Sequence, residues 1–97
     1  DIRANYGASI IASDGGVVTT AGWHYSYGNY VIINHGGGRQ TLYAHASSLA
    51  VHVGQAVSQG QVIAYVGSTG NSTGNHCHFE MHHNGTLVSA RNFFGGM

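Results

Sequence analysis

The chain has 97 residues, of which only three are acidic and three basic, and it contains no lysine. A chain of this length forms one small domain with a single core. Without clustered Lys and Arg, nucleic acid and anionic membrane surfaces are not expected partners. No apolar run approaches the ~20 residues of a membrane span, and the one cysteine, Cys77, excludes an internal disulfide.

Short strands joined by tight turns are expected along the chain, because sixteen glycines occur without any proline and apolar residues alternate with polar ones. The expected strands, in chain order, are 9–13, 16–22, 28–35, 40–46, 49–53, 61–67, 76–83 and 85–89. The two segments with the clearest alternation, 28–35 and 40–46, are expected to form a hairpin. The sequence therefore predicts an all-β fold of mostly antiparallel strands, curled into a sandwich-like sheet with an open groove.

A polar loop, Gly67–Asn75, leads directly into the strand that is richest in histidine. Its sequence, GSTGNSTGN, suits either a flexible wall of a substrate cleft or an ordinary connection. Both readings stay open from the sequence alone.

Four of the eight histidines lie within residues 76–83. Side chains alternate along a strand, so one face carries His76, His78, Glu80 and His82, and the other carries Cys77, Phe79, Met81 and His83. The mostly apolar second face predicts that Cys77 is a small buried core residue. His76 and His78 then lie side by side, with Cα atoms roughly 6.6 Å apart at ~3.3 Å per residue. One could hold a metal ion while the other acts on a water in the open coordination position.

Other histidines carry weaker signals. His82 and His83 adjoin the Asn84-Gly85 turn and are expected to be structural. His24 and His52 belong to no motif and are expected at the surface. An exposed aromatic platform of Trp23, Tyr25, Tyr27 and Tyr30 is one possibility, and ordinary packing of these rings is the other.

Four spaced motifs occur in a fixed order along the chain: YGNYVIINHGGG (Tyr27–Gly38), LYAH (Leu42–His45), VGQAVSQGQVIAYVGSTG (Val53–Gly70) and STGNHCHFEMHHNG (72–85). Together they resemble the lysostaphin and LytM-type zinc metallopeptidases, over nearly the whole chain. The order in that family is H-x-x-x-D, then Y-x-H, then H-x-H followed by Phe-Glu. The resemblance implies a fold of the duplicated hybrid motif type.

The resemblance also implies roles for individual residues. Asp1 and His78 would be zinc ligands, and His45 and His76 the catalytic pair. The family's first ligand, a histidine four positions before the aspartate, has no counterpart here. We therefore expect residues 1–97 to be a single metallopeptidase-like domain that is truncated at its N-terminus. Substitution by His24 or His35, or chelation by the α-amino group of Asp1, are the alternatives for the third ligand.

The function implied by the resemblance is zinc-dependent hydrolysis of a peptide bond in bacterial peptidoglycan, in the cross-bridge or the stem peptide, in the cell wall or periplasm. Glu80 could orient a ligand imidazole or be a solvated strand residue. The competing interpretation is an inactive regulatory or wall-binding module of the same fold. A biotinyl or lipoyl carrier is excluded because the chain has no lysine to carry the cofactor.

Overall fold

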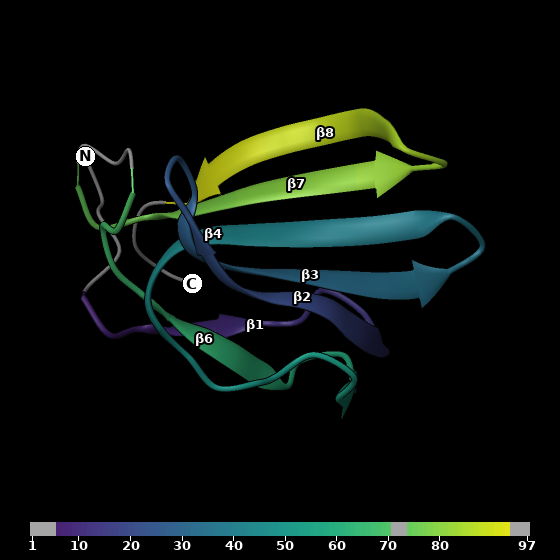
Figure 1. The fold of residues 1–97 in the computed structure, drawn as a ribbon, viewed down its shortest axis with the longest axis horizontal. Coiled ribbons are helices and arrows are strands. Elements are labelled where there is room, and N and C mark those ends of the chain that lie inside the picture. Colours follow the sequence, from purple (N-terminus) through teal and green to yellow (C-terminus); the bar gives the residue numbers. More distant parts are fainter. Residues whose placement is uncertain (1–5, 71–73, 94–97) are drawn as a thin grey trace.

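The computed structural model describes residues 6–70 and 74–93, and the strands of this part form one antiparallel sheet (Figure 1). They are β1 (Ser9–Ile11), β2 (Gly16–His24), β3 (Gly28–Gly36), β4 (Arg39–Leu49), β5 (Ala56–Val57), β6 (Val62–Val66), β7 (Cys77–His83) and β8 (Thr86–Phe93). The described residues include no helix, and so none that could cross a membrane. The predicted all-β, antiparallel fold is confirmed.

The sheet branches at its longest strand, β4. Its order is β1-β6-β4-β3-β2-β5, and β7 pairs separately with β4 and then with β8. Residues 39–44 of β4 pair with β7, whereas residues 46–49 pair with β6. Figure 1 accordingly shows β7 and β8 on one side of β4 and β1 and β6 on the other. The sheet is therefore curled, as the sequence predicted.

The two faces of the curled sheet differ in the side chains that they carry, because side chains alternate along each strand. The inward face of β3 and β7 carries Val31, Ile33 and Cys77, all fully buried against β1 and β6. Burial raises the pKa of the Cys77 thiol to about 12, so this residue is the inert core residue that was predicted. On the opposite face, Ile32, Leu42 and Glu80 lie in register across β3, β4 and β7. This second face is the one that carries polar chemistry.

The prediction of a separate strand at residues 49–53 is wrong. β4 continues through Leu49, and the chain then turns, with Gly54 at φ 91°. Val51 is buried in the core, which explains the apolar alternation of this segment without a strand. The turn is closed by bonds from Ala50 N to the Ile63 carbonyl and from Gly54 N to the Val18 carbonyl, at 2.9 and 2.8 Å.

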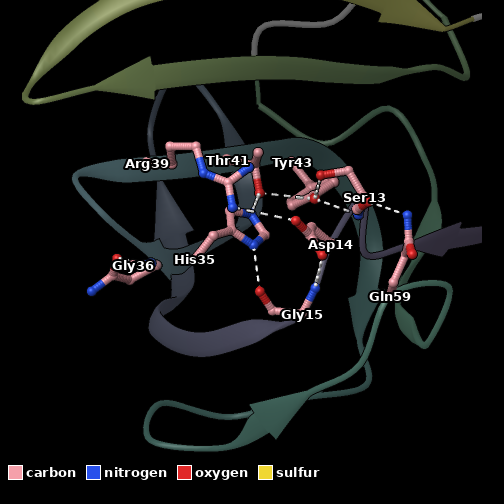
Figure 2. Close-up of polar contacts among 10 residues, drawn as sticks. Ser13, Asp14, Gly15, His35, Gly36, Arg39, Thr41, Tyr43 and Gln59 are labelled. Atoms are coloured by element: carbon pink, nitrogen blue, oxygen red, sulfur yellow. Dashed lines mark hydrogen bonds and ion pairs between the residues drawn. The ribbon is translucent and has the colours of Figure 1, made fainter.

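A cluster of hydrogen-bonded polar groups connects the β1–β2 turn to β3 and β4 (Figure 2). The two ring nitrogens of His35 lie 2.7 Å from the Gly15 carbonyl and 2.7 Å from Thr41 Oγ1. The Thr41 hydroxyl donates to the Tyr43 hydroxyl at 2.8 Å, which in turn donates to Ser13 Oγ at 3.0 Å. At the exposed rim, Arg39 pairs with Asp14 at 3.4 Å. We name Ser13, Gly15, His35, Thr41 and Tyr43 the His35 cluster.

Candidate active site

β7 and the residue before it, His76, carry predicted site residues on the polar face of the sheet. Opposite β4, His78 pairs with Ala44, Glu80 with Leu42, and His82 with Gln40. His76 precedes the strand and is fixed by a bond from its backbone N to the Gly67 carbonyl at 3.1 Å. Its side chain is almost fully buried.

His45 reaches this face through a bulge. In regular alternation it would share the core face with Tyr43, but two β4 residues, Ala44 and His45, oppose the single residue Tyr30 of β3. His45 takes a φ of 65°, a left-handed conformation that costs a non-glycine residue about 1–2 kcal/mol. Its ring centroid consequently lies 4.9 Å from that of His76 and 6.2 Å from that of His78. Two distant segments of the chain thus bring three imidazoles together.

Backbone carbonyls orient two of these rings. Nδ1 of His45 lies 2.7 Å from the Thr69 carbonyl, and Nδ1 of His76 lies 3.0 Å from the Gly74 carbonyl. A carbonyl only accepts, so each Nδ1 carries a hydrogen, and in the neutral ring the lone pair is on Nε2. Both rings are thereby set in the tautomer whose Nε2 can accept a proton.

The acid–base state of His45 also suits proton transfer. Burial, followed by the charges of the nearby His76 and His78 rings, lowers the pKa of His45, and the bond to Thr69 only partly opposes this shift. His45 is therefore neutral at neutral pH and able to act as a base.

Glu80 connects His78 to further residues. Oε2 of Glu80 accepts from His78 Nε2 at 2.8 Å and from the Tyr27 hydroxyl at 3.0 Å, and Oε1 accepts from His82 Nε2 at 2.8 Å. Burial alone would raise the pKa of Glu80, but the hydrogen bonds from His82, His78 and Tyr27 outweigh it and hold the pKa below its ordinary value. Glu80 is thus an ionised carboxylate that fixes the His78 ring, rather than a solvated strand residue.

Tyr27 comes from the β2–β3 turn, which reaches over the sheet beside the start of β7 (Figure 1). Its ring stacks on that of His78 at a centroid distance of 6.3 Å and an interplanar angle of 16°. Burial, and then the bond to Glu80, raise the pKa of Tyr27, so the hydroxyl stays a donor. The sequence analysis placed Tyr27 in the motif YGNYVIINHGGG and in a possible aromatic platform, but it did not predict the contact with His78 and Glu80.

Three of the four rings of the expected aromatic platform gather around His24. Its ring centroid lies 4.6 Å from that of Tyr25, 5.0 Å from that of Tyr27 and 5.9 Å from that of Tyr30, whereas Trp23 is exposed and joins none of these ring pairs. His24 is half-buried, which corrects the expectation that it lies at the surface. Its Nδ1 accepts from the backbone nitrogens of Ser26 and Tyr27, at 3.0 and 3.3 Å, and so shapes the turn.

The loop before His76 has a structural task that the sequence left open. The carbonyl of Thr69 holds His45, while its hydroxyl donates to the Ala46 carbonyl at 2.6 Å. Gly28 packs so closely on this loop that a Cβ would lie 2.3 Å from Thr69 Oγ1. Glycine at position 28 therefore lets the loop approach β3 and position His45.

The donor chemistry of the cluster fits zinc only in part within the described residues. Imidazole nitrogen is a standard zinc donor, and a carboxylate on the other nitrogen of a ligating histidine is its usual supporting partner. Because His78 Nε2 donates a hydrogen bond to Glu80, the lone pair of the neutral ring is on Nδ1. This is the nitrogen through which the ring would bind a metal ion. The second predicted ligand, Asp1, lies outside the described residues, and the described part by itself forms no group of three His, Cys, Asp or Glu able to hold a metal.

Comparison with known proteins decides the family. The sequence pattern of Peptidase family M23 matches residues 1–90, almost the whole chain. The chain belongs to peptidase family M23. The resemblance found from the spaced motifs is thereby confirmed.

Curated relatives of this M23 chain include peptidoglycan enzymes. "DD-carboxypeptidase/endopeptidase Mpg" of Neisseria meningitidis serogroup B is 46% identical over 89 residues, covering 92% of this chain and 20% of the relative. "Peptidoglycan DD-endopeptidase ShyA" of Vibrio cholerae is 41% identical over 90 residues, covering 93% of this chain and 21% of the relative. The chain thus spans about a fifth of the length of these relatives.

Solved structures share the fold. A zinc containing peptidase from Vibrio cholerae superimposes with a TM-score of 0.85 at 36% identity, over 88% of this chain and 26% of that one. The catalytic domain of lysostaphin from Staphylococcus simulans gives a TM-score of 0.82 at 33% identity, over 90% of this chain and 70% of that one. The curled antiparallel sheet is therefore that of lysostaphin-like peptidases.

Proposed function

We propose that this M23 chain is the catalytic domain of a zinc-dependent endopeptidase that cleaves a peptide bond of bacterial peptidoglycan, in the cross-bridge or stem, in the cell wall or periplasm. The observation that carries the proposal is the convergence of His45 on His76 and His78, at 4.9 and 6.2 Å between ring centroids. A relative named as a peptidoglycan DD-endopeptidase and a zinc containing structural neighbour support the substrate and the metal.

His78 and Asp1 would hold the zinc ion, with a histidine four positions before Asp1 as the third ligand. A bound zinc ion would polarise a carbonyl and would lower the pKa of a bound water to about 7. Glu80 keeps the His78 ring in one tautomer and orientation through the 2.8 Å bond to Nε2. This support would fix the direction from which His78 meets the metal.

His45 would move the proton and His76 would orient the water. His45 is held neutral by burial, with its Nδ1 hydrogen on the Thr69 carbonyl, so Nε2 takes a proton from the attacking water. The protonated His45 would return this proton to the leaving amine, while the Nε2 lone pair of His76, 4.9 Å away and oriented by the Gly74 carbonyl, would accept a hydrogen bond from the water and orient it. The near-complete burial of both rings limits exchange with bulk solvent.

The test is digestion of purified peptidoglycan by the protein that carries this chain, with products identified by mass spectrometry. We expect peptide cleavage that a chelator abolishes and one equivalent of zinc restores. Binding to peptidoglycan without cleavage, and without bound metal, would instead support the regulatory or wall-binding module.

A further inference from the structure

The turn between β2 and β3, residues 25–27, contacts both halves of the candidate active site. The Tyr27 carbonyl accepts a hydrogen bond from the backbone N of His45 at 2.7 Å. The Tyr27 hydroxyl donates to Glu80 at 3.0 Å, and the Tyr27 ring stacks on that of His78 at 6.3 Å between centroids. One residue of the turn therefore contacts the proposed base, the proposed zinc ligand and the carboxylate that orients this ligand.

The side chain of His24, the last residue of β2, fixes the backbone of this turn. Its Nδ1 accepts hydrogen bonds from the backbone N of Ser26 at 3.0 Å and from that of Tyr27 at 3.3 Å. A side-chain acceptor that bonds the backbone two residues later closes a local turn, as an Asn side chain does in an Asx turn. His24 thus holds the part of the backbone from which the Tyr27 ring and carbonyl project.

The ring of His24 also packs against its neighbours. Its centroid lies 4.6 Å from that of Tyr25, 5.0 Å from that of Tyr27 and 5.9 Å from that of Tyr30. Packing and hydrogen bonding are two different ways in which His24 could hold the turn. Ring packing has little directional preference, whereas two hydrogen bonds to successive backbone nitrogens define the course of the chain.

We propose that His24 is a positioning residue of the candidate active site, which acts through Tyr27 by means of its Nδ1 acceptor. By fixing the turn, it keeps the Tyr27 ring on His78 and the Tyr27 carbonyl on the backbone N of His45. The effect on catalysis rests on the proposed function. The proposal gives a role to a histidine that belongs to none of the sequence motifs.

Two substitutions separate the hydrogen bonds of His24 from the packing of its ring. His24→Asn removes the ring and keeps an acceptor, because Oδ1 of Asn is bonded to Cγ where His carries Nδ1. His24→Phe keeps an aromatic ring beside Tyr25 and Tyr30 and removes the acceptor. We expect His24→Phe to lower kcat roughly 10- to 100-fold, as displacements of about 1 Å near reacting groups do, and His24→Asn to stay within about 3-fold of the wild-type protein. Equal rates in the two variants, or the reverse order, would overturn the proposal.

The matched control is His52→Phe, the same substitution at an exposed histidine, which should leave kcat unchanged. Urea unfolding of each variant verifies that it is folded under the assay conditions. His24→Leu replaces His24→Phe if the Phe variant does not fold, since Leu has a carbon in place of Nδ1 and likewise lacks the acceptor.

Nuclear magnetic resonance of the metal-free protein separates this proposal from the proposed function. A nuclear Overhauser contact between the Tyr27 and His78 rings should occur in the wild-type protein and in His24→Asn, and should be lost in His24→Phe. If the wild-type protein cleaves no peptidoglycan but the contact follows this order, the function fails and the positioning of Tyr27 stands. If peptidoglycan is cleaved and His24→Phe keeps both the contact and the rate, the positioning role fails and the function stands.

Discussion

Two histidines from neighbouring strands, His35 of the His35 cluster and His45 of the candidate site, differ in what their nitrogens do. Both nitrogens of His35 bond groups within the fold, the Gly15 carbonyl and Thr41 Oγ1. His45 uses Nδ1 on the Thr69 carbonyl, and no described residue bonds its Nε2. A histidine whose two ring nitrogens both bond to the fold stabilises the structure. A histidine that bonds through one nitrogen is oriented by that bond and can use the other nitrogen in a reaction.

The backbone of the two residues differs in the same sense. His35 also lies where the β3–β4 register shifts, between Asn34 and Gly36, but its φ is negative, so its backbone stays in the ordinary range. His45 lies in a bulge with a φ of 65°. Strained conformations of this kind persist where surrounding structure enforces them, often at functional sites. Here the bond from His45 N to the Tyr27 carbonyl, 2.7 Å, helps to hold the residue in place.

Replacing each histidine by alanine gives the largest expected contrast. His45→Ala should lower kcat/KM by roughly 100- to 10,000-fold, the usual loss on removing a general base. His35→Ala should keep activity within a few fold but lower the free energy of unfolding by about 1–3 kcal/mol, because Thr41 loses a buried partner. Peptidoglycan digestion and urea denaturation of both variants check this. Equal losses of activity would abolish the distinction.

Removing the charge of Glu80 should have the next largest effect. Glu80→Gln keeps one acceptor oxygen and replaces the other by an amide nitrogen, which cannot accept, so His78 and His82 cannot both keep their bonds, and zinc affinity should fall roughly 10- to 100-fold. Tyr27→Phe is the milder control, since it removes one donor and leaves the carboxylate on both histidines. Chelator competition measures both. An unchanged zinc affinity in Glu80→Gln would mean that Glu80 does not support the metal site.

The lowered pKa of His45 predicts a specific pH dependence of stability. The unfolded chain binds a proton at this residue near its ordinary pKa of 6.5, whereas the folded protein binds it only at lower pH. The free energy of unfolding of the metal-free protein should therefore fall as pH drops below ~6.5. His45→Ala should lose this part of the slope in urea titrations between pH 7.5 and 5, and an identical slope would contradict the assignment.

The smallest expected effect isolates the backbone at position 45. His45→Gly and His45→Ala both lack the imidazole, so both should be inactive. Glycine adopts a positive φ without a Cβ clash, so the Gly variant should be about 1 kcal/mol more stable than the Ala variant. Thermal unfolding of the two proteins measures the difference. Should Ala be the more stable of the two, the strain at this position would be negligible.

Much of the site was predictable because it depends on one strand. Alternation along residues 76–83 placed His76, His78 and Glu80 on one face and Cys77 in the core, and the structure agrees. Asn84 and Gly85 both take positive φ, as the turn prediction requires. His82, expected to be an ordinary structural residue, proved to hold Glu80. The role of Asp1 stays a prediction, since that residue lies outside the described part.

The sequence by itself determined the all-β class, the two faces of β7 and the family, because alternation and motif spacing are local properties of the chain. Tertiary structure alone decided that His45 crosses to the polar face, that Tyr27 covers His78 and that Thr69 orients His45. These contacts depend on how β4 pairs with β3, β6 and β7. The bulge at His45 arises from pairing between distant segments, which no local pattern records.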